Sequence, residues 1–382
     1  MTQVYFDNAA TTKIHPEVAE EMMKVMLEVS GNPSSTHAPG RTAKSYIENA
    51  RKSIAQILNC SPGEIVFTSG GTESDNLVIN GAVRDLQVKR IITSKIEHHA
   101  VLHSAHEMVR QYDITLDYVV LKPCGTPDEK HLEELLKQGD KKTLVSLMHV
   151  NNEIGNLIDI KAIAELCKKH NALIHSDMVQ SIGHYSIDMT DVPIDFAAAS
   201  AHKFHGPKGV GFAFVRKNSG LKSLIFGGSQ ERGLRAGTES VHNIVGLGKS
   251  LQMAYDNLEK DRDYINGVKN YFAERLSKEI PGAKFNGNCA FADKSTYTLL
   301  NVCLPVPKEK ALMLLFQLDM KGIACSKGSA CQSGSDKGSH VLSEVLDADS
   351  RTKPNVRFSF STYNTKEDVD YTISVLKEFV AA

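Results

Sequence analysis

Lys203 lies in the stretch of this sequence with the most distinctive chemistry, S-A-H-K-F-H-G-P-K, which begins at Ser200. Shortly before it, H-S-D-M-V-Q (175–180) places Asp177 at the end of an apolar run that predicts a strand. A lysine flanked by hydroxyl and imidazole groups, with an acidic residue from a nearby strand end, suits pyridoxal 5′-phosphate (PLP). The lysine would form the Schiff base, Asp177 would keep the pyridine nitrogen protonated, and Ser200 and His202 would hold the phosphate. The alternative is a solvated surface lysine, which is what most lysines are.

A glycine turn at S-G-G-T-E-S-D-N (69–76) follows another predicted strand and precedes a helical pattern. A helix that opens on such a turn exposes backbone N–H groups and the positive end of its dipole, and both favour phosphate binding. Gly71 and Thr72 are the natural contacts. Taken alone, an ordinary capped turn between a strand and a helix is the commoner interpretation of these residues.

Two further polar segments also follow predicted strands. E-H-H-A-V (97–101) places His98 at the sheet edge, where an imidazole could stack on a cofactor ring and move protons near neutral pH. H-V-N-N-E-I-G (149–155) contains Asn151 and Asn152, whose amides could hydrogen-bond a ring hydroxyl or a substrate carboxylate. The alternatives are a surface histidine, in a chain with 15 histidines, and a pair of asparagines that only form a turn.

A Gly- and Ser-rich segment, C-S-K-G-S-A-C-Q-S-G-S-D-K-G-S-H (325–340), contains Cys331. Because the segment is polar and poor in apolar residues, it predicts a mobile loop. A thiol on such a loop is a candidate nucleophile, whereas a structural cysteine would be buried among apolar residues. The alternative is a cysteine with no role. Cys325, six residues earlier, is a second thiol near this loop.

The elements that would position these residues alternate between strand and helix. From about residue 45 to 215, short apolar runs alternate with amphipathic helical stretches. This pattern predicts an α/β fold with a large, mostly parallel sheet covered on both faces. Ligands bind at the carboxyl ends of the strands in such sheets. The predicted strands lie at residues 64–68, 90–94, 116–120, 144–148, 172–176, 196–200 and 211–215.

After about residue 240, a long helical stretch runs to about residue 278 and is followed by a shorter α+β pattern. At 382 residues the chain exceeds a single hydrophobic core, so we expect two domains. The predicted large domain, which would bind PLP, covers residues 15–255. The predicted small domain combines residues 1–14 with 256–382 and would carry the cysteine loop.

Composition narrows the classes of function. Formal net charge is −1, Lys+Arg (44) balances Asp+Glu (45), and no basic stripe indicates nucleic-acid binding. The N-terminus has no signal-peptide pattern, and no apolar run approaches membrane-spanning length. Seven cysteines without regular spacing fit free thiols in a reducing compartment. Together these features predict a soluble cytoplasmic protein.

In combination the motifs resemble those of cysteine desulfurases of the NifS/IscS-like branch, within the class V aminotransferase family. Matching segments occur in the family's order from residue 5 to the final helix, including Y-F-D-N-A-A-T-T, R-G-L-R-A-G-T and G-S-A-C-Q-S. The resemblance implies PLP-dependent fold type I, which is aspartate aminotransferase-like with a seven-stranded sheet, and a homodimer. It also implies conversion of L-cysteine to L-alanine. Sulfur would pass to an enzyme persulfide and then to an acceptor such as an iron–sulfur cluster scaffold protein.

The resemblance further implies individual roles. Lys203 would be the Schiff-base lysine, and Cys331 would be the nucleophile that carries the persulfide. The residues implied to hold PLP are His98 stacked on the ring, Asp177 at the pyridine nitrogen, Gln180 and Asn152 near the ring oxygen, and Gly71, Thr72, Ser200, His202 and Thr238 of the partner subunit at the phosphate.

Three alternatives share some of these features. A selenocysteine lyase would have the same fold and lysine but would depend less on the loop thiol. Another PLP-dependent enzyme, such as an aminotransferase or decarboxylase, would not need Cys331. A cofactor-bound regulatory scaffold would not need the complete set of Lys203, Asp177 and His98.

One position departs from the family pattern. Relatives often have an arginine for the substrate carboxylate shortly after an R-F-S-hydrophobic stretch, and Thr362 aligns there in this sequence. A neutral hydroxyl cannot supply the bidentate, charged pair that arginine offers a carboxylate. Either Arg357, Asn152 or Asn32 compensates, or binding of the amino acid is weakened. On this alignment, Thr362→Arg is predicted to lower the KM for L-cysteine.

Overall fold

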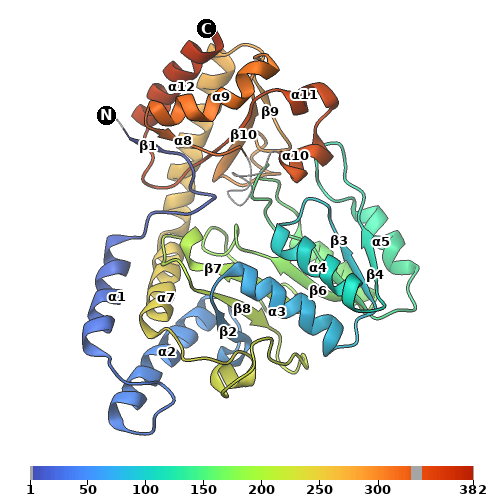
Figure 1. The fold of residues 1–382 in the computed structure, drawn as a ribbon, viewed down its shortest axis with the longest axis vertical. Coiled ribbons are helices and arrows are strands. Elements are labelled where there is room, and N and C mark those ends of the chain that lie inside the picture. The colour runs from blue at the N-terminus through green and yellow to red at the C-terminus, as the bar shows by residue number, and fades with distance from the viewer. Residues whose placement is uncertain (1–2, 328–337, 382) are drawn as a thin grey trace.

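A seven-stranded sheet forms the centre of the larger part of the molecule (Figure 1). The computed structural model describes residues 3–327 and 338–381. The strand order is β2-β8-β7-β6-β5-β3-β4; β8 runs antiparallel to both of its neighbours, and the remaining neighbours are parallel. The predicted large, mostly parallel seven-stranded sheet is therefore confirmed. Its strands are β2 (Ile65–Thr68), β3 (Arg90–Thr93), β4 (Thr115–Tyr118), β5 (Thr143–Ser146), β6 (Leu173–Asp177), β7 (Phe196–Ser200) and β8 (Gly211–Val215).

Helices cover both faces of this sheet, because successive strand residues point to opposite sides. Within β5, Val145 belongs to one cluster of buried side chains and Leu144 to another. The first cluster includes residues of α2 (Ala38–Ile57), α5 (Glu129–Lys137), α6 (Ile160–Lys169) and α7 (Val241–Asp256), and the second includes residues of α3 (Gly71–Arg84) and α4 (His99–Gln111).

Helix α6 illustrates how the sequence specifies these elements. Asp159 caps its first turn, since its side-chain oxygen accepts a hydrogen bond from the Ala162 backbone N–H at 2.9 Å. Its last turn contains Lys168 and Lys169, whose charges favour the helix C-terminus. Apolar residues recur at helical spacing on one face and are buried against the sheet: Ile160, Ile163, Ala164 and Cys167.

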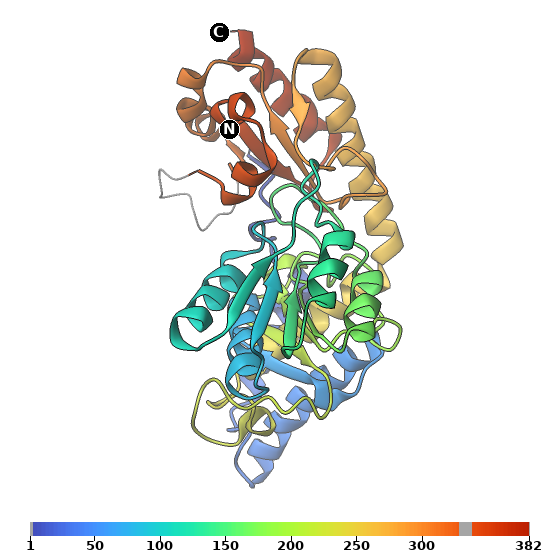
Figure 2. The same ribbon diagram turned by 90° about the vertical axis from the view of Figure 1, so that its right-hand side faces the viewer.

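A smaller α+β unit lies at the other end of the molecule (Figures 1 and 2). It contains a three-stranded antiparallel sheet in the order β12-β10-β9, and β1 pairs in parallel with β11. The elements are β1 (Val4–Tyr5), α8 (Leu258–Glu279), β9 (Lys284–Phe285), β10 (Leu299–Cys303), α9 (Lys308–Met320), β11 (Ile323–Ala324), α10 (His340–Val345), α11 (Ala348–Thr352), β12 (Asn355–Ser359) and α12 (Lys366–Ala381). The remaining elements, outside this unit, are α1 (Pro16–Glu28) and the short 3-10 helices η1 (Pro62–Glu64), η2 (Ala201–Lys203) and η3 (Gln230–Gly233).

Aromatic packing joins the N-terminus to this smaller unit. Phe6 is fully buried, and its ring centroid lies 5.7 Å from that of Phe272, 6.2 Å from Phe358 and 5.3 Å from Phe360. These edge-on arrangements are the favoured geometry of aromatic pairs. The long helical stretch predicted between residues 240 and 278 is two helices, because α7 ends at Asp256 and α8 begins at Leu258. Within the two described ranges, no helix is both long and apolar enough to cross a membrane.

Candidate active site

Five strand ends meet at one edge of the large sheet. β3, β5, β6 and β7 are parallel, and β2 shares their direction because β8 is antiparallel to both β2 and β7. The carboxyl ends of these strands therefore lie on the same side. The predicted site residues follow these ends: Gly71 and Thr72 after β2, His98 after β3, Asn152 after β5, Asp177 and Gln180 at the end of β6, and Ser200, His202 and Lys203 at the end of β7.

The Lys203 side chain reaches the segment between β1 and α1. Its Nζ donates hydrogen bonds to the carbonyl oxygens of Ala9 at 2.6 Å and Ala10 at 2.9 Å. Gln180 Nε2 donates to the same Ala9 oxygen at 2.9 Å. The N-terminal segment therefore forms one wall of the site, although Ala9 and Lys203 are 194 residues apart in the chain.

Asp177, His98 and Asp75 form an ionisable centre beside Lys203. One nitrogen or carboxylate oxygen from each lies within 4.8 Å of the other two. Burial raises the pKa of Asp177, and the nearby charge of Lys203 opposes this rise. Burial also lowers the pKa of His98, which leaves its imidazole neutral at pH 7. Asp177 Oδ1 accepts a hydrogen bond from the Val179 N–H at 2.9 Å, so its carboxylate is fixed at the strand end.

The turn between β2 and α3 approaches the end of β7 closely. Gly70 has a φ of +151°, in a region that favours glycine. A Cβ atom added at Gly70 would lie 3.5 Å from Ser200 Oγ, and one added at Gly71 would lie 2.6 Å from a methyl group of Val179. The second distance is too short for a Cβ atom unless Val179 shifts, so the close packing at residue 71 favours glycine. The N-terminus of α3 consequently lies beside the Ser200 hydroxyl.

His202 follows β7 and Thr72 follows β2, at the same edge of the sheet. His202 Nδ1 is 3.2 Å from Thr11 Oγ1, which again involves the N-terminal segment. Burial, together with the charge of Lys203, lowers the pKa of His202 to about 4. Its neutral ring can therefore donate one N–H at pH 7. Thr72 is the second residue of α3 and is exposed, which leaves its hydroxyl accessible to a ligand.

Arg357 of β12 brings a buried guanidinium to this region. Its Nη1 donates to the Asn152 carbonyl oxygen at 2.7 Å, and its Nη2 pairs with Asp7 Oδ1 at 2.8 Å. The side chain is 1% exposed, and across the described ranges its buried Nε has no hydrogen-bond partner. The cation beside Asn152 is therefore Arg357.

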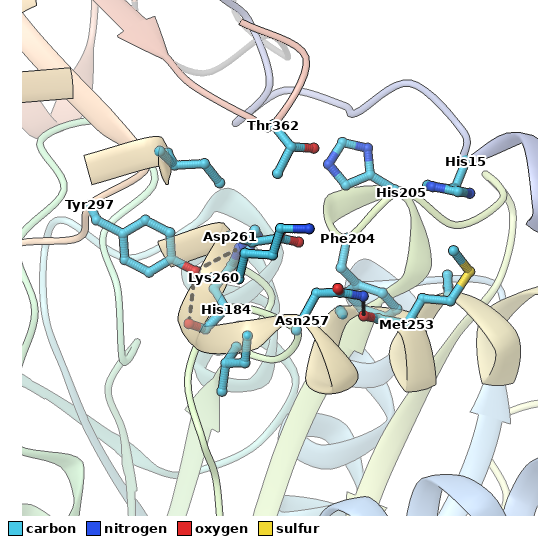
Figure 3. Close-up of a pocket in the computed structure, with 15 residues that line it drawn as sticks. His15, His184, Phe204, His205, Met253, Asn257, Lys260, Asp261, Tyr297 and Thr362 are labelled. Atoms are coloured by element: carbon cyan, nitrogen blue, oxygen red, sulfur yellow. Dashed lines mark hydrogen bonds between the residues drawn. The ribbon is translucent and has the colours of Figure 1, made fainter. Parts of the chain in front are cut away.

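Thr362 lines a different cavity, of about 250 Å³, between the two units (Figure 3). His15, from the segment before α1, and His205 line it together with Asn257, at the break between α7 and α8. Figure 3 shows Thr362 and the His205 ring next to each other at this cavity. The cavity lining shares no residue with the predicted PLP contacts. Thr362, the position that the resemblance implied should match an arginine, therefore lines a cavity separate from the predicted PLP contacts.

Comparison with known proteins identifies the family of the chain. The model of the family described as "Aminotransferase class-V" matches residues 4–372. The chain belongs to the class V aminotransferase family. Cysteine desulfurase IscS of Dictyoglomus turgidum is 38% identical over 380 residues, covering 99% of this chain and 94% of the relative. Cysteine desulfurase IscS of Methanosarcina thermophila is 41% identical over 381 residues, covering 99% and 92%.

Comparison with solved structures agrees with the sequence comparison. A NifS-like protein superposes with a TM-score of 0.90 at 34% identity, covering 100% of both chains. A structure described as SspA in complex with cysteine superposes with a TM-score of 0.81 at 31% identity, covering 95% of this chain and 100% of that one. The predicted resemblance to cysteine desulfurases and the predicted PLP fold type I are both confirmed.

Two predictions for this class V protein concern residues away from the sheet edge. Cys331 lies outside the described residues. Burial, together with the charge of Asp7, raises the pKa of the Cys325 thiol. Cys325 therefore holds little thiolate at neutral pH and is poorly suited to act as a nucleophile. Thr238 is exposed on the segment between η3 and α7.

Three buried ionisable residues at this site were not predicted from the sequence. Asp75 lies in S-G-G-T-E-S-D-N, Glu97 in E-H-H-A-V and His175 in H-S-D-M-V-Q. Each falls within a motif whose neighbouring residues were already predicted to bind PLP. That position is the sequence signal that could have identified these three residues. Asp75 is four residues after Gly71 in α3, so helical periodicity places both on the same side of the helix.

Proposed function

We propose that this protein is a PLP-dependent cysteine desulfurase that converts L-cysteine to L-alanine and transfers the sulfur to Cys331. The observation that carries the proposal is the convergence of Lys203, Asp177 and His98 at one sheet edge. Relatives named cysteine desulfurase IscS, at 38% and 41% identity over 99% of the chain, support it.

The residues at this edge fit PLP in charge and shape. The N-terminus of α3, the Ser200 hydroxyl and the neutral His202 imidazole together offer donors suited to a phosphate. The buried Asp177 carboxyl suits a protonated pyridine nitrogen, and Lys203 supplies the amine that would link to the cofactor. When bound, PLP supplies an electron sink for negative charge that develops at the substrate Cα.

Residues of this chain would perform the proton transfer and the binding of substrate. The Lys203 amine would carry the proton of the substrate Cα. The Asp177 carboxylate would accept a hydrogen bond from the ring nitrogen and keep that nitrogen protonated. Arg357, which lies beside Asn152 with a buried and unpartnered Nε among the described residues, would bind the substrate carboxylate. Asn152 and Gln180 would orient the ring oxygen.

Sulfur transfer would take place at Cys331. The thiolate of Cys331 would attack the substrate sulfur, so that an S–S bond forms as the substrate C–S bond breaks. The substrate carbon takes up a proton and leaves as alanine, and Cys331 becomes a persulfide. No external oxidant or reductant is required for this step. The persulfide would then pass its sulfur to an acceptor, for which an iron–sulfur cluster scaffold protein is our proposal.

We further propose a cytoplasmic homodimer in which Thr238 contacts the phosphate of the other subunit. Its exposure in the single chain supports this role. We also propose a large domain of residues 15–255 and a small domain of residues 1–14 with 256–382. Separate clusters of buried side chains in the two parts of the molecule support this division.

Alanine and sulfide released from L-cysteine, measured together with added reductant, test the proposal. Wild type should release both in equal amounts, and Cys331→Ala should release almost none. Cys325→Ala is the matched control, and we expect it to remain active because burial disfavours its thiolate. If Cys331→Ala keeps full activity, and does so with selenocysteine as well, the protein is a selenocysteine lyase or another PLP enzyme.

A further inference from the structure

Asp75 of α3 is a second carboxyl group buried next to Asp177. It is 1% exposed, and one of its oxygens lies within 4.8 Å of a carboxylate oxygen of Asp177. Its Oδ1 lies 3.4 Å from His175 Nε2. Neither this Oδ1 nor His175 Nε2 has a hydrogen-bond partner among the described residues. A buried carboxyl in such a place is not explained by the role proposed for Asp177 alone.

The groups around Asp75 do not compensate two negative charges. His175 and Asp177 face it from β6, and Glu97 and His98 face it from the segment between β3 and α4. Burial lowers the pKa of His175 to about 3 and also lowers the pKa of His98, so both imidazoles are neutral at pH 7. Burial raises the pKa of Glu97 well above its usual value.

Two adjacent buried carboxyls that lack a full cationic partner cannot both ionise without a large free-energy cost. Asp177 is the better carboxylate of the two. It accepts the Val179 N–H at 2.9 Å, and the positive charge of Lys203 favours its ionised form. Asp75 has neither a backbone donor at Oδ1 nor a nearby ammonium in the described structure. Burial and the charge of Asp177 raise the pKa of Asp75 well above its usual value.

We propose that Asp75 is a positioning residue that stays protonated in the working enzyme and donates its O–H to the Asp177 carboxylate. A hydrogen bond to the ionised form would keep Asp177 charged and aimed at the ring nitrogen of PLP. Ser146 Oγ lies 2.8 Å from His175 Nδ1. That contact fixes the His175 ring, whose Nε2 lies 3.4 Å from Asp75 Oδ1. This inference rests on the proposed PLP-dependent function.

Infrared spectroscopy of the full-length, cofactor-free protein tests the proton directly. The difference between wild type and Asp75→Asn should show loss of one protonated-carboxyl stretching band that shifts in D₂O. Glu97→Gln is the control, because it removes a different buried carboxyl whose Oε1 accepts the Met148 N–H at 3.0 Å. If Asp75→Asn removes only carboxylate bands, Asp75 is ionised and the proposal is wrong. This measurement stands even if the protein does not bind PLP.

The PLP-loaded protein provides the second test. The absorbance of the cofactor linked to Lys203 is titrated with pH in wild type, Asp75→Asn and Asp75→Leu. The amide is neutral and still donates, so we expect Asp75→Asn to keep the wild-type midpoint. In Asp75→Leu the lost donor raises the proton affinity of Asp177, so the proton shared with the ring nitrogen would move to Asp177, and the neutral ring should raise the midpoint. We expect kcat to fall about tenfold in Asp75→Leu, the size of one hydrogen bond to a charged group.

A shifted midpoint in Asp75→Asn would mean that the wild-type residue carries a charge, and it would overturn the proposal. An unshifted midpoint in a folded Asp75→Leu would overturn the positioning role. Circular dichroism establishes whether Asp75→Leu is folded. If it is not, the Asp75→Asn midpoint and the infrared band decide the question by themselves.

Discussion

The edge of the large sheet and the cavity between the two units lie on either side of Lys203, yet they differ in how their side chains are held. The Lys203 Nζ faces Ala9 at the sheet edge, while the Lys203 carbonyl oxygen lies 3.1 Å from Nε2 of His184, which lines the cavity. At the sheet edge, parallel strand ends fix buried groups such as Asp177 in one place. The cavity is lined by residues of α7 and α8 together with loop residues from distant parts of the chain, such as His15 and Thr362 (Figure 3).

Arg357 and Thr362 show what this difference teaches. They are five residues apart, but Arg357 lies within β12 and contacts Asn152, whereas Thr362 lies past the strand end and lines the cavity. Alignment of a short motif cannot show which of the two residues contacts Asn152 and which lines the cavity. The ordered backbone of β12 decides which of the two reaches the sheet edge.

Lys203→Ala should have the largest effect, since it removes the amine at the sheet edge that we propose would link to PLP. We expect loss of the long-wavelength absorbance of the bound cofactor and of alanine formation. Lys208→Ala is the control, because Lys208 belongs to the same motif but is exposed. If Lys208→Ala is the colourless variant, Lys203 has been assigned the wrong role. The measurements are an absorbance spectrum after incubation with PLP and an alanine assay.

Arg357→Gln should have the next largest effect. A charged hydrogen bond contributes about 1.5–3 kcal/mol, and each 1.4 kcal/mol changes affinity about tenfold. We therefore expect the KM for L-cysteine to rise about tenfold to a hundredfold, with a smaller change in kcat. Arg357 also pairs with Asp7, so urea unfolding should be measured on the same variant. An unchanged KM in a folded variant would show that the substrate carboxylate is bound elsewhere.

Much of the sheet edge was predictable from the sequence. Residues of β7 and β8 are buried throughout, so these strands appear as continuous apolar runs. The polar residues that follow such runs must lie at strand ends, and this is enough to place His98, Asp177 and Lys203 at the same edge. The prediction works because local patterns determine both strands and their ends.

The remainder depends on contacts between distant parts of the chain. Local patterns cannot pair Ala9 with Lys203, and they cannot reveal that β8 runs antiparallel between β2 and β7. The break at Asn257 was also missed, because the residues on both sides are amphipathic and helical. Asp75 was overlooked because its burial depends on how α3 packs against the sheet.

The buried carboxyl pair also predicts an effect of pH on stability. The pKa of Asp75 is raised in the folded protein, whereas an aspartate in the unfolded chain titrates at about 3.9. The stability from this protonated group is complete below about pH 3.9 and is lost as pH rises through the folded pKa. Within that window the free energy of unfolding should fall by up to about 1.4 kcal/mol per pH unit.

Urea unfolding of the cofactor-free protein at several pH values measures how the free energy of unfolding changes with pH. Asp75→Asn cannot titrate, so its unfolding free energy should depend less on pH, and the variant should be more stable than wild type at the upper end of the window. Parallel pH profiles for the two proteins would mean that Asp75 does not hold the proton in the folded state.

Thr362→Arg should have the smallest effect, and this expectation reverses the one drawn from sequence alignment. Thr362 lines the cavity with His15 and His205, while the guanidinium beside Asn152 is already supplied by Arg357. We expect the KM of Thr362→Arg for L-cysteine to stay within about twofold of wild type, which corresponds to less than about 0.5 kcal/mol. The sharper test adds Thr362→Arg to Arg357→Gln. If residue 362 can reach the substrate carboxylate, the second arginine will restore the low KM; if it remains in the cavity, the double variant will bind L-cysteine as weakly as Arg357→Gln alone.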